Sequence, residues 1–220
     1  MSECFMENIN IDEIISCLDK IANILHDKPA QAMSELRQIS ARVDSQVTYR
    51  DGHNQRVSKY SLQLGRQLGL DDQKMVILET AALLHDFGKI CIDEKILIKP
   101  SSLTEREKSE IHQHAIKGYY ILAGFTEFQD ALDGVRTHHE RFDGLGYPEG
   151  LVKDNIPFIG RIIAVADAYD AMTSKRPYRE ARTKEQAARE LQRCSGSQFD
   201  PIVVDAFITI LNIGACRKKI

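Results

Sequence analysis

The sequence lacks any pair of cysteines at a metal-binding or redox spacing. Its 220 residues include five cysteines, an odd number, and none of them forms a CxxC motif. A disulfide framework and a zinc knuckle are therefore both excluded. We predict reduced thiols in the core or on the surface, at Cys4, Cys17, Cys91, Cys194 and Cys216.

Long apolar runs and an excess of positive charge are also missing. No run of about 18 apolar residues occurs, and the N-terminal MSECFMENINIDEI has no basic segment followed by an apolar one. The net charge is -3, from 29 basic and 32 acidic side chains, so no global field attracts long nucleic acid or a membrane surface. We expect a cytoplasmic protein in which local cations or metals hold any polyanionic ligand.

No internal repeat and no linker rich in Gly, Ser or Pro divides the chain, and no stretch alternates with period two for long enough to predict a strand. Apolar residues instead recur at spacings of three and four, which is typical of helices. The hydrophobic share of 43% is enough to bury a core. We therefore predict an all-α fold, with one domain of ordinary size and a small accessory segment.

Capping residues indicate where the first helices begin and end. Asn10 can cap an apolar stripe over residues 11–25, and Pro29 suits the first turn of a second stripe over 29–47. A third stripe covers 53–68 and ends at Gly69. Two helices are thus predicted in the N-terminal segment, before the third.

Later helices carry similar signals. A helix capped by Asp71 or Asp72 is predicted to continue through MVILETAALLHD until Gly88 ends it. Further helix starts are indicated by two capping boxes and a proline, namely Thr104 with Glu107, Thr183 with Gln186, and Asp200 before Pro201. The longest non-helical segment, residues 141–157, is rich in Gly, Asp and Pro, and a loop of that size is usually functional.

Five histidines and two aspartates fall on inward faces of these helices. His53 shares a stripe with Val57, and the apolar segment AALLHDFGK carries His85 and Asp86. Asp167 interrupts the apolar run RIIAVADAYDAM, where an unpaired buried carboxylate would be costly. The whole set is His53, His85, Asp86, His114, His138, His139 and Asp167.

This set predicts a site for two metal ions that share a water or hydroxide. A single inward histidine is more often a hydrogen-bonded core residue, but five with two buried aspartates favour metal binding. Imidazole and carboxylate together suit iron, manganese, nickel or zinc. Asp86, in the centre of the set, is expected to bridge the two ions. His26 and His112 are left out, the first at a helix end and the second on another face.

Six segments resemble the HD-GYP family of metal phosphohydrolases. They are DGHNQRV at 51–57, LLHDFGKI at 83–90, HAIKG at 114–118, HHERFDGLGYPEGL at 138–151, RIIAVADAYDAMTSKRPYR at 161–179 and SQFDPIVVDAF at 197–207. The resemblance implies a helical HD-domain bundle over residues 47–214 with a long GYP loop. Residues 1–46 would form an N-terminal pair of extra helices of unknown role, and 215–220 a C-terminal tail.

The resemblance also implies an activity, the hydrolysis of cyclic di-GMP to linear pGpG and in some members onward to GMP. His53, His85, Asp86 and Asp167 would surround one metal ion, iron or manganese, and Asp86, His114, His138 and His139 the other. Members with a third metal resemble one another in a glutamate four residues before the first histidine. Because that position is Tyr49 here, we expect two ions, and a bridging hydroxide that attacks phosphorus.

Candidate substrate contacts lie beside these ligands. Lys89 can reach a phosphate oxygen as a compact charge, and Arg176 and Arg179 suit bidentate contact with phosphate or a guanine edge. Asp170, one turn after Asp167, can orient a ligand or a base, and Tyr147 of the GYP segment can shape the wall beside the substrate. The resemblance also marks this loop as a surface for a protein partner.

Three alternatives stay open at the level of the sequence. The same metal site could act on 3′,3′-cyclic GMP-AMP or on a nucleotide monophosphate. The chain could instead be a non-catalytic receptor for a cyclic dinucleotide, although every expected ligand is present. The apolar stripes of the two N-terminal helices could be covered by the catalytic domain or by a second copy, so a homodimer is one of two arrangements.

Overall fold

Helices make up the regular structure of the chain. A computed structural model describes residues 10–47, 52–175 and 180–211, and within them the all-α prediction is confirmed, because the only β-type contacts are two isolated bridges. The helices are α1 (Ile11–Leu25), α2 (Pro29–Val47), α3 (His53–Gln67), α4 (Asp72–Leu84), η1 (Phe87–Cys91), α5 (Glu94–Leu97), α6 (Glu105–His112), α7 (His114–Leu122), η2 (Thr126–Ala131), α8 (Leu132–Thr137), η3 (Lys153–Asn155), α9 (Phe158–Thr173), α10 (Lys184–Arg193) and α11 (Pro201–Ile210).

The predicted caps are present. The Asn10 side chain accepts hydrogen bonds from the backbone N–H groups of Asp12 and Glu13, and Asp71 caps α4 in the same way. The capping boxes that start α6 and α10 are complete, and Asp200 caps α11 with Pro201 in the first turn. Each cap satisfies backbone donors that a helix start leaves without partners.

Two predicted helix boundaries are wrong. The helix after Asp71 ends at Leu84 rather than running on to Gly88, which lies inside η1. This tighter turn presses Gly88 against α7, where a Cβ atom on residue 88 would lie 2.0 Å from the carbonyl oxygen of His114. His114, which we expected to share one helix with Ile111 and Gly118, begins a helix of its own, because the chain is divided at Gln113 into α6 and α7. Both breaks place a histidine at the end of a helix.

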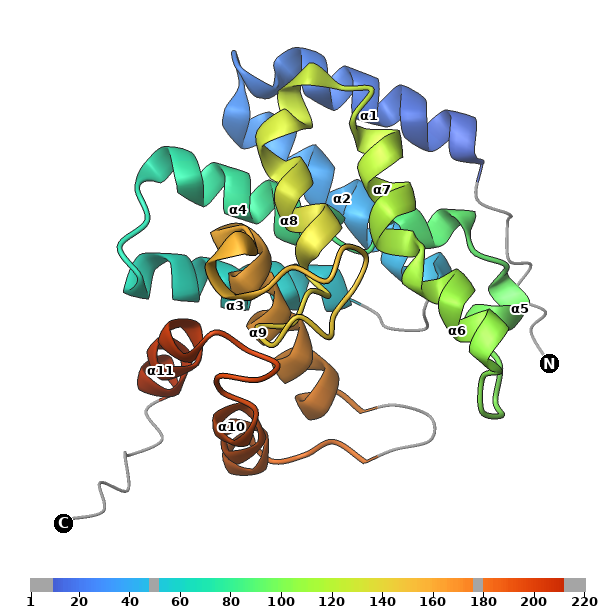
Figure 1. The fold of residues 1–220 in the computed structure, drawn as a ribbon. Helices are drawn as coiled ribbons and strands as arrows, with labels where there is room; N and C mark the ends of the chain where they lie inside the picture. Colours follow the sequence, from blue (N-terminus) through green and yellow to red (C-terminus); the bar gives the residue numbers. More distant parts are fainter. Residues whose placement is uncertain (1–9, 48–51, 176–179, 212–220) are drawn as a thin grey trace, which may run out of the picture.

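The core consists of two clusters of buried side chains. One joins α3, α4 and α9 to α10 and α11, which lie together at one end of the molecule in Figure 1. The other joins α1 and α2 to the end of α4, η1, α7 and α8. Because α4 contributes to both clusters, the residues that follow Leu84 lie where the two clusters meet.

The apolar stripes of α1 and α2 pack onto the rest of this same chain. Leu18, Leu36 and Val43 are buried in one cluster with Leu83 and Phe87. The described structure therefore matches the first of the two arrangements that the sequence allowed, although a homodimer through other surfaces remains a prediction. The division at residue 46 also remains a prediction.

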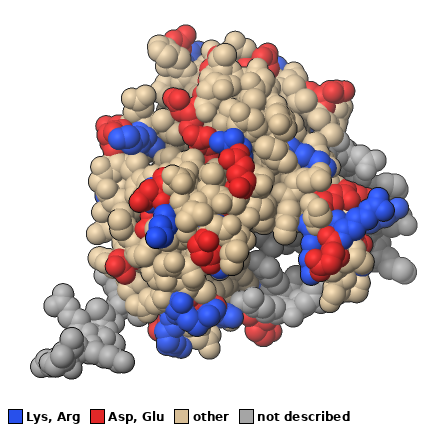
Figure 2. Space-filling view, viewed as in Figure 1, with Lys and Arg blue, Asp and Glu red and all other residues tan. Residues whose placement is uncertain are grey.

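Charges of both signs are scattered over the face drawn in Figure 2, in agreement with the small net charge. None of the helices in the described part of the chain combines the length and the hydropathy that crossing a bilayer requires.

Candidate metal centre

The first of two side-chain groups contains His53, His85 and Asp86. One ligand atom from each lies within 4.8 Å of the others, and all three residues are buried. His53 begins α3, whereas His85 and Asp86 follow the last residue of α4. Asp167 on α9 adjoins this group, with its Oδ1 atom 3.3 Å from Nε2 of His53. The structure thus brings together the four residues predicted for one metal ion.

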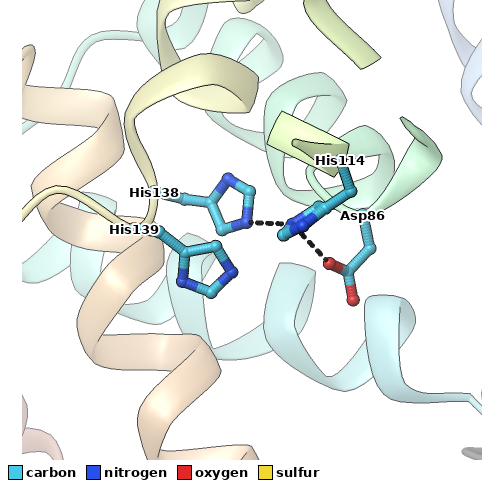
Figure 3. A group of neighbouring side chains, drawn as sticks. All are labelled: Asp86, His114, His138 and His139. Atoms are coloured by element: carbon cyan, nitrogen blue, oxygen red, sulfur yellow. Dashed lines mark hydrogen bonds and ion pairs between the residues drawn. The ribbon is translucent and has the colours of Figure 1, made fainter. Parts of the chain in front are cut away.

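The second group contains Asp86, His114, His138 and His139. Figure 3 shows these side chains turned toward one another, with His114 joined to both His138 and Asp86. Oδ1 of Asp86 lies 3.3 Å from Nε2 of His114, whereas Oδ2 lies 3.6 Å from Nε2 of both His53 and His85. The two oxygens of Asp86 therefore face different groups, which is the geometry that a bridging carboxylate needs.

The histidine rings are oriented by their other nitrogen atoms. Nδ1 contacts the backbone carbonyl three residues earlier in His85 (2.8 Å to Ala82), His114 (2.6 Å to Ile111) and His138 (2.7 Å to Val135). When Nδ1 donates, Nε2 carries a lone pair and becomes a ligand atom. The two Nε2 atoms of His114 and His138 are then only 3.2 Å apart, and a cation bound by both would remove the repulsion of their lone pairs.

The pKa values keep most of these groups in the form that binds metal. Burial lowers the pKa of His138 well below its usual range and the pKa of His139 to about 3, so both imidazoles are neutral near pH 7. Burial opposes the ionised form of Asp86, but the charge of Lys89 and the neighbouring histidines hold its pKa well below the usual range. Neutral imidazoles and an ionised carboxylate are the protonation states of metal ligands.

His53 differs from the other histidines. Burial alone would lower its pKa, but the close contacts with Asp167 and Asp170 and the negative charges of Asp167 and Asp86 raise the pKa of His53 to about 9. In the metal-free protein this ring therefore holds two protons near neutral pH.

The donor set fits metal ions. Nε2 of His53 and Nε2 of His85 are buried and directed toward Asp86, and neither has a well-formed hydrogen bond within the described residues. The 3.3 Å contact of His53 Nε2 with Asp167 falls outside hydrogen-bond geometry. A buried polar atom without a partner is costly, and a metal ion would satisfy both. Nitrogen and carboxylate ligands together suit first-row transition metals.

The predicted substrate contacts have mixed placements. Lys89 is 9% exposed and its ammonium group pairs with Asp86 Oδ2, so it lies at the centre of the site. Asp170 is buried and contacts His53 and Arg56. Tyr147 lies beside His139, with their ring centres 4.8 Å apart. Their contact with substrate remains a prediction. Arg176, Arg179 and Tyr49 lie outside the described residues.

The long loop is anchored by Glu140, a residue that the sequence analysis missed. Its buried carboxylate accepts hydrogen bonds from the backbone N–H groups of Glu149, Gly150 and Leu151 at 2.7 to 3.1 Å. Gly146 packs so closely that a Cβ atom there would lie 2.3 Å from the backbone nitrogen of Arg141. These contacts fold the loop back onto the two histidines that precede it.

Two more residues of the site were missed. Arg56 lies one helical turn after His53, and that spacing was a usable signal. His112 was set aside because it lies on another face from His114, yet its ring stacks on Tyr147 with 4.0 Å between ring centres. No sequence pattern indicates this contact, because Tyr147 reaches His112 only through the folded loop.

The comparison with protein families decides the assignment. A family model described as "HD domain" matches residues 21–203. The chain belongs to the HD domain family. Within this family, the predicted HD-GYP resemblance is confirmed by the curated relatives.

Curated relatives of this HD domain protein are named as phosphodiesterases. The cyclic di-GMP phosphodiesterase response regulator RpfG of Xanthomonas campestris is 43% identical over 78% of this chain and 47% of the relative. A cyclic di-GMP phosphodiesterase of Thermotoga maritima is 41% identical over 72% of this chain and 44% of the relative. The 3′3′-cGAMP-specific phosphodiesterase 3 of Vibrio cholerae is 36% identical over 78% of this chain and 37% of the relative. The chain spans less than half the length of each.

Two solved structures share the fold of this HD domain protein. A cyclic GMP-AMP specific phosphodiesterase of V. cholerae superposes with a TM-score of 0.65 at 19% identity, over 81% of this chain and 48% of that one. An HDG"Y"P protein from Bdellovibrio bacteriovorus superposes with a TM-score of 0.61 at 20% identity, over 91% of this chain and 71% of that one. At such identities the likeness supports the fold alone.

Proposed function

We propose that this chain is a metal-dependent phosphodiesterase that hydrolyses cyclic di-GMP to linear pGpG. The observation that carries the proposal is the pair of histidine groups that share Asp86, found in a chain whose relatives are named for this activity. Two ions are expected, with iron or manganese as the identity to test first. The first is assigned to His53, His85, Asp86 and Asp167, and the second to Asp86, His114, His138 and His139.

When bound, such ions supply a water of lowered pKa as the nucleophile and stabilise charge on the phosphoryl oxygens. The residues of the chain provide the rest. Asp86 presents one oxygen to each group, and Lys89 balances its charge from within the site. Tyr147 is half-buried beside His139, and this burial raises its pKa further above the usual range, so its hydroxyl stays protonated and can donate to a phosphate oxygen.

Recognition of the rest of the substrate is assigned to Lys89, Tyr147, Arg176 and Arg179 on the sequence argument. Asp170, whose carboxylate contacts His53 and Arg56, is assigned the orienting of a ligand. The GYP loop is also proposed as a contact surface for a protein partner, and the 79% exposure of Leu145 at its tip supports that assignment. The chemistry of a cyclic dinucleotide, with two phosphates and two purines, suits a site with cations and an adjacent loop.

A second substrate has specific support. Several relatives that are 34% to 36% identical are named as 3′3′-cGAMP-specific phosphodiesterases. The two candidate dinucleotides differ in one purine, so the same metal centre can serve either, and base contacts decide between them.

The test is anaerobic purification with metal analysis, followed by incubation of iron- or manganese-loaded protein with each dinucleotide and chromatography of the products. We expect about two ions per chain and linear product from cyclic di-GMP, faster than from 3′3′-cGAMP. Asp86→Asn, which keeps the side-chain shape, is the matched inactive control. Bound metal without turnover of either substrate would favour the receptor alternative.

A further inference from the structure

His53 is held by a contact of a kind that His85, His114 and His138 lack. Its Nδ1 atom lies 2.7 Å from Oδ2 of Asp170, a carboxylate on α9 that is 1% exposed. His85, His114 and His138 instead use backbone carbonyls three residues earlier. The orientation of His53 therefore depends on a side chain from a different helix, 117 residues away in the sequence.

Helix α9 contacts both nitrogen atoms of this ring. Asp170 binds Nδ1, and Asp167, one turn earlier on the same helix, lies 3.3 Å from Nε2. Any rotation of the Asp170 carboxylate would tilt the imidazole away from Asp86, because an N–H donor follows its acceptor. The position of Asp170 thus sets the direction of Nε2.

Arg56 fixes that carboxylate. Its Nε donates to Oδ1 of Asp170 at 2.6 Å and its Nη2 donates to Oδ2 at 3.1 Å, a two-point contact between planar groups. Arg56 and His53 lie one turn apart on α3, so the same carboxylate binds two side chains of one helix. A monodentate cation at residue 56 would leave Asp170 free to rotate.

We infer that Arg56 is a positioning residue for the metal site of the first group, acting on His53 through Asp170. This role rests on the proposed metal centre but assigns a function to a residue outside the two proposed ligand groups. Outer-shell partners of metal ligands typically change metal affinity by about 10- to 100-fold. The effect should fall on one ion only, because His114 and His138 of the second group are oriented by backbone carbonyls.

The experiment loads the full chain with Mn²⁺, removes free metal and follows the ions retained per chain during a challenge with excess EDTA. Arg56→Ala should release one ion at least about tenfold faster than wild type and the other at the wild-type rate, matching the pattern of His53→Ala. Arg56→Lys keeps the charge but loses the two-point guanidinium contact. Its rate of metal release should be closer to that of Arg56→Ala than to that of wild type. Arg66→Ala, an exposed arginine on the same helix, is the matched control.

Asp170→Asn provides a second route to the same answer. If Arg56 acts through Asp170, the double variant Arg56→Ala with Asp170→Asn should release the ion no faster than Asp170→Asn alone. Release of both ions at wild-type rates from folded Arg56→Ala and Arg56→Lys, or equal acceleration of both ions, overturns the role. A wild-type chain that binds no Mn²⁺ overturns the metal centre and this role together. Because no substrate is used, a lack of phosphodiesterase activity does not affect the result.

Discussion

The two ligand groups of the metal centre are supported in different ways. In the group of Asp86, His114, His138 and His139, two of the histidines are oriented by carbonyls of their own helices. In the group of His53, His85 and Asp86, His53 depends on carboxylates from α9 and on Arg56. The contacts with backbone carbonyls form as soon as the helix forms. The contacts of His53 with the carboxylates form only when α3 packs against α9.

This difference predicts unequal sensitivity. A local contact survives small movements between helices, because donor and acceptor move together. A contact between helices is lost when either helix shifts, and hydrogen bonds weaken steeply with distance and angle. We therefore expect the second group to be the more robust metal site, with Asp86 as the one residue on which both groups depend.

The largest effect on metal content is expected from substitution of Asp86, because both ligand groups would then lose their ion. Asp86→Ala and Asp86→Asn should both reduce bound metal from about two ions to fewer than about 0.5 per chain, because a bridging carboxylate serves both ions. Elemental analysis after anaerobic purification measures this, and circular dichroism checks that the helices remain. Asp86→Ala also leaves Lys89 buried without its partner, at a cost of about 3–5 kcal/mol, so Asp86→Asn is the safer variant.

The matched control is Asp19→Ala, an exposed aspartate on α1 far from the site in sequence. Two ions per chain in folded Asp86→Asn would show that Asp86 is not the bridge. One retained ion would instead identify the group that holds metal without it.

The sequence predicts this centre well where the signals are local. Capping residues locate most helix starts, and burial of polar residues on apolar stripes identifies the seven candidate ligands, which the structure brings together. Two boundaries fail because close packing decides them, as at Gly88, where contact with α7 replaces a helical turn by η1. Helical periodicity carries no information on that contact.

The supporting residues are harder to predict. Arg56 and Asp170 are separated by 114 positions, and Glu140 binds backbone groups that reach it only after the loop has folded. The sequence left open whether Asp170 orients a ligand or a base, because its spacing from Asp167 was known but its partners on α3 were not. Residue type and spacing indicate which side chains point inward, whereas tertiary packing decides what they contact.

The two ligand groups are also expected to differ in the pH dependence of their metal affinity. The pKa of His53 is raised to about 9 in the metal-free protein by Asp167 and Asp170, against burial, whereas burial lowers the pKa of His139 to about 3. Metal must displace a proton from His53 below pH 9 but none from His139. The affinity of the first group should therefore rise about tenfold per pH unit between about pH 6 and 8, and that of the second group far less.

Mn²⁺ titrations at about pH 6, 7 and 8 measure the metal affinities of the two groups. The His53→Ala variant lacks a ligand of the first group, so the affinity that it retains belongs to the second group. The same shift has a consequence for stability. The protonated His53 stabilises the metal-free fold below its usual pKa of 6.5, and this contribution is lost as the pH rises through about 9. Equal pH dependence of both metal affinities would contradict the assignment of the raised pKa to His53.

The smallest effect is expected outside the ligands, at His112. Its ring stacks on Tyr147, and Tyr147 adjoins His139, so the contact should matter to the second group alone. Aromatic pairs contribute about 0.5–1.5 kcal/mol, and Glu140 anchors the loop independently. His112→Ala should therefore lower the free energy of unfolding by no more than about 1.5 kcal/mol and raise KM by no more than about tenfold. Thermal denaturation and steady-state kinetics measure the two effects.

His112→Phe keeps an aromatic ring at this position and should restore most of both properties, and His26→Ala, an exposed histidine at the end of α1, serves as the control. Metal release from the first group should be unchanged in all three variants, because no contact links Tyr147 to His53 among the described ring pairs. If His112→Ala accelerates release from the first group as well, the two groups are coupled through the loop. The separation between local and interhelical support would then have to be abandoned.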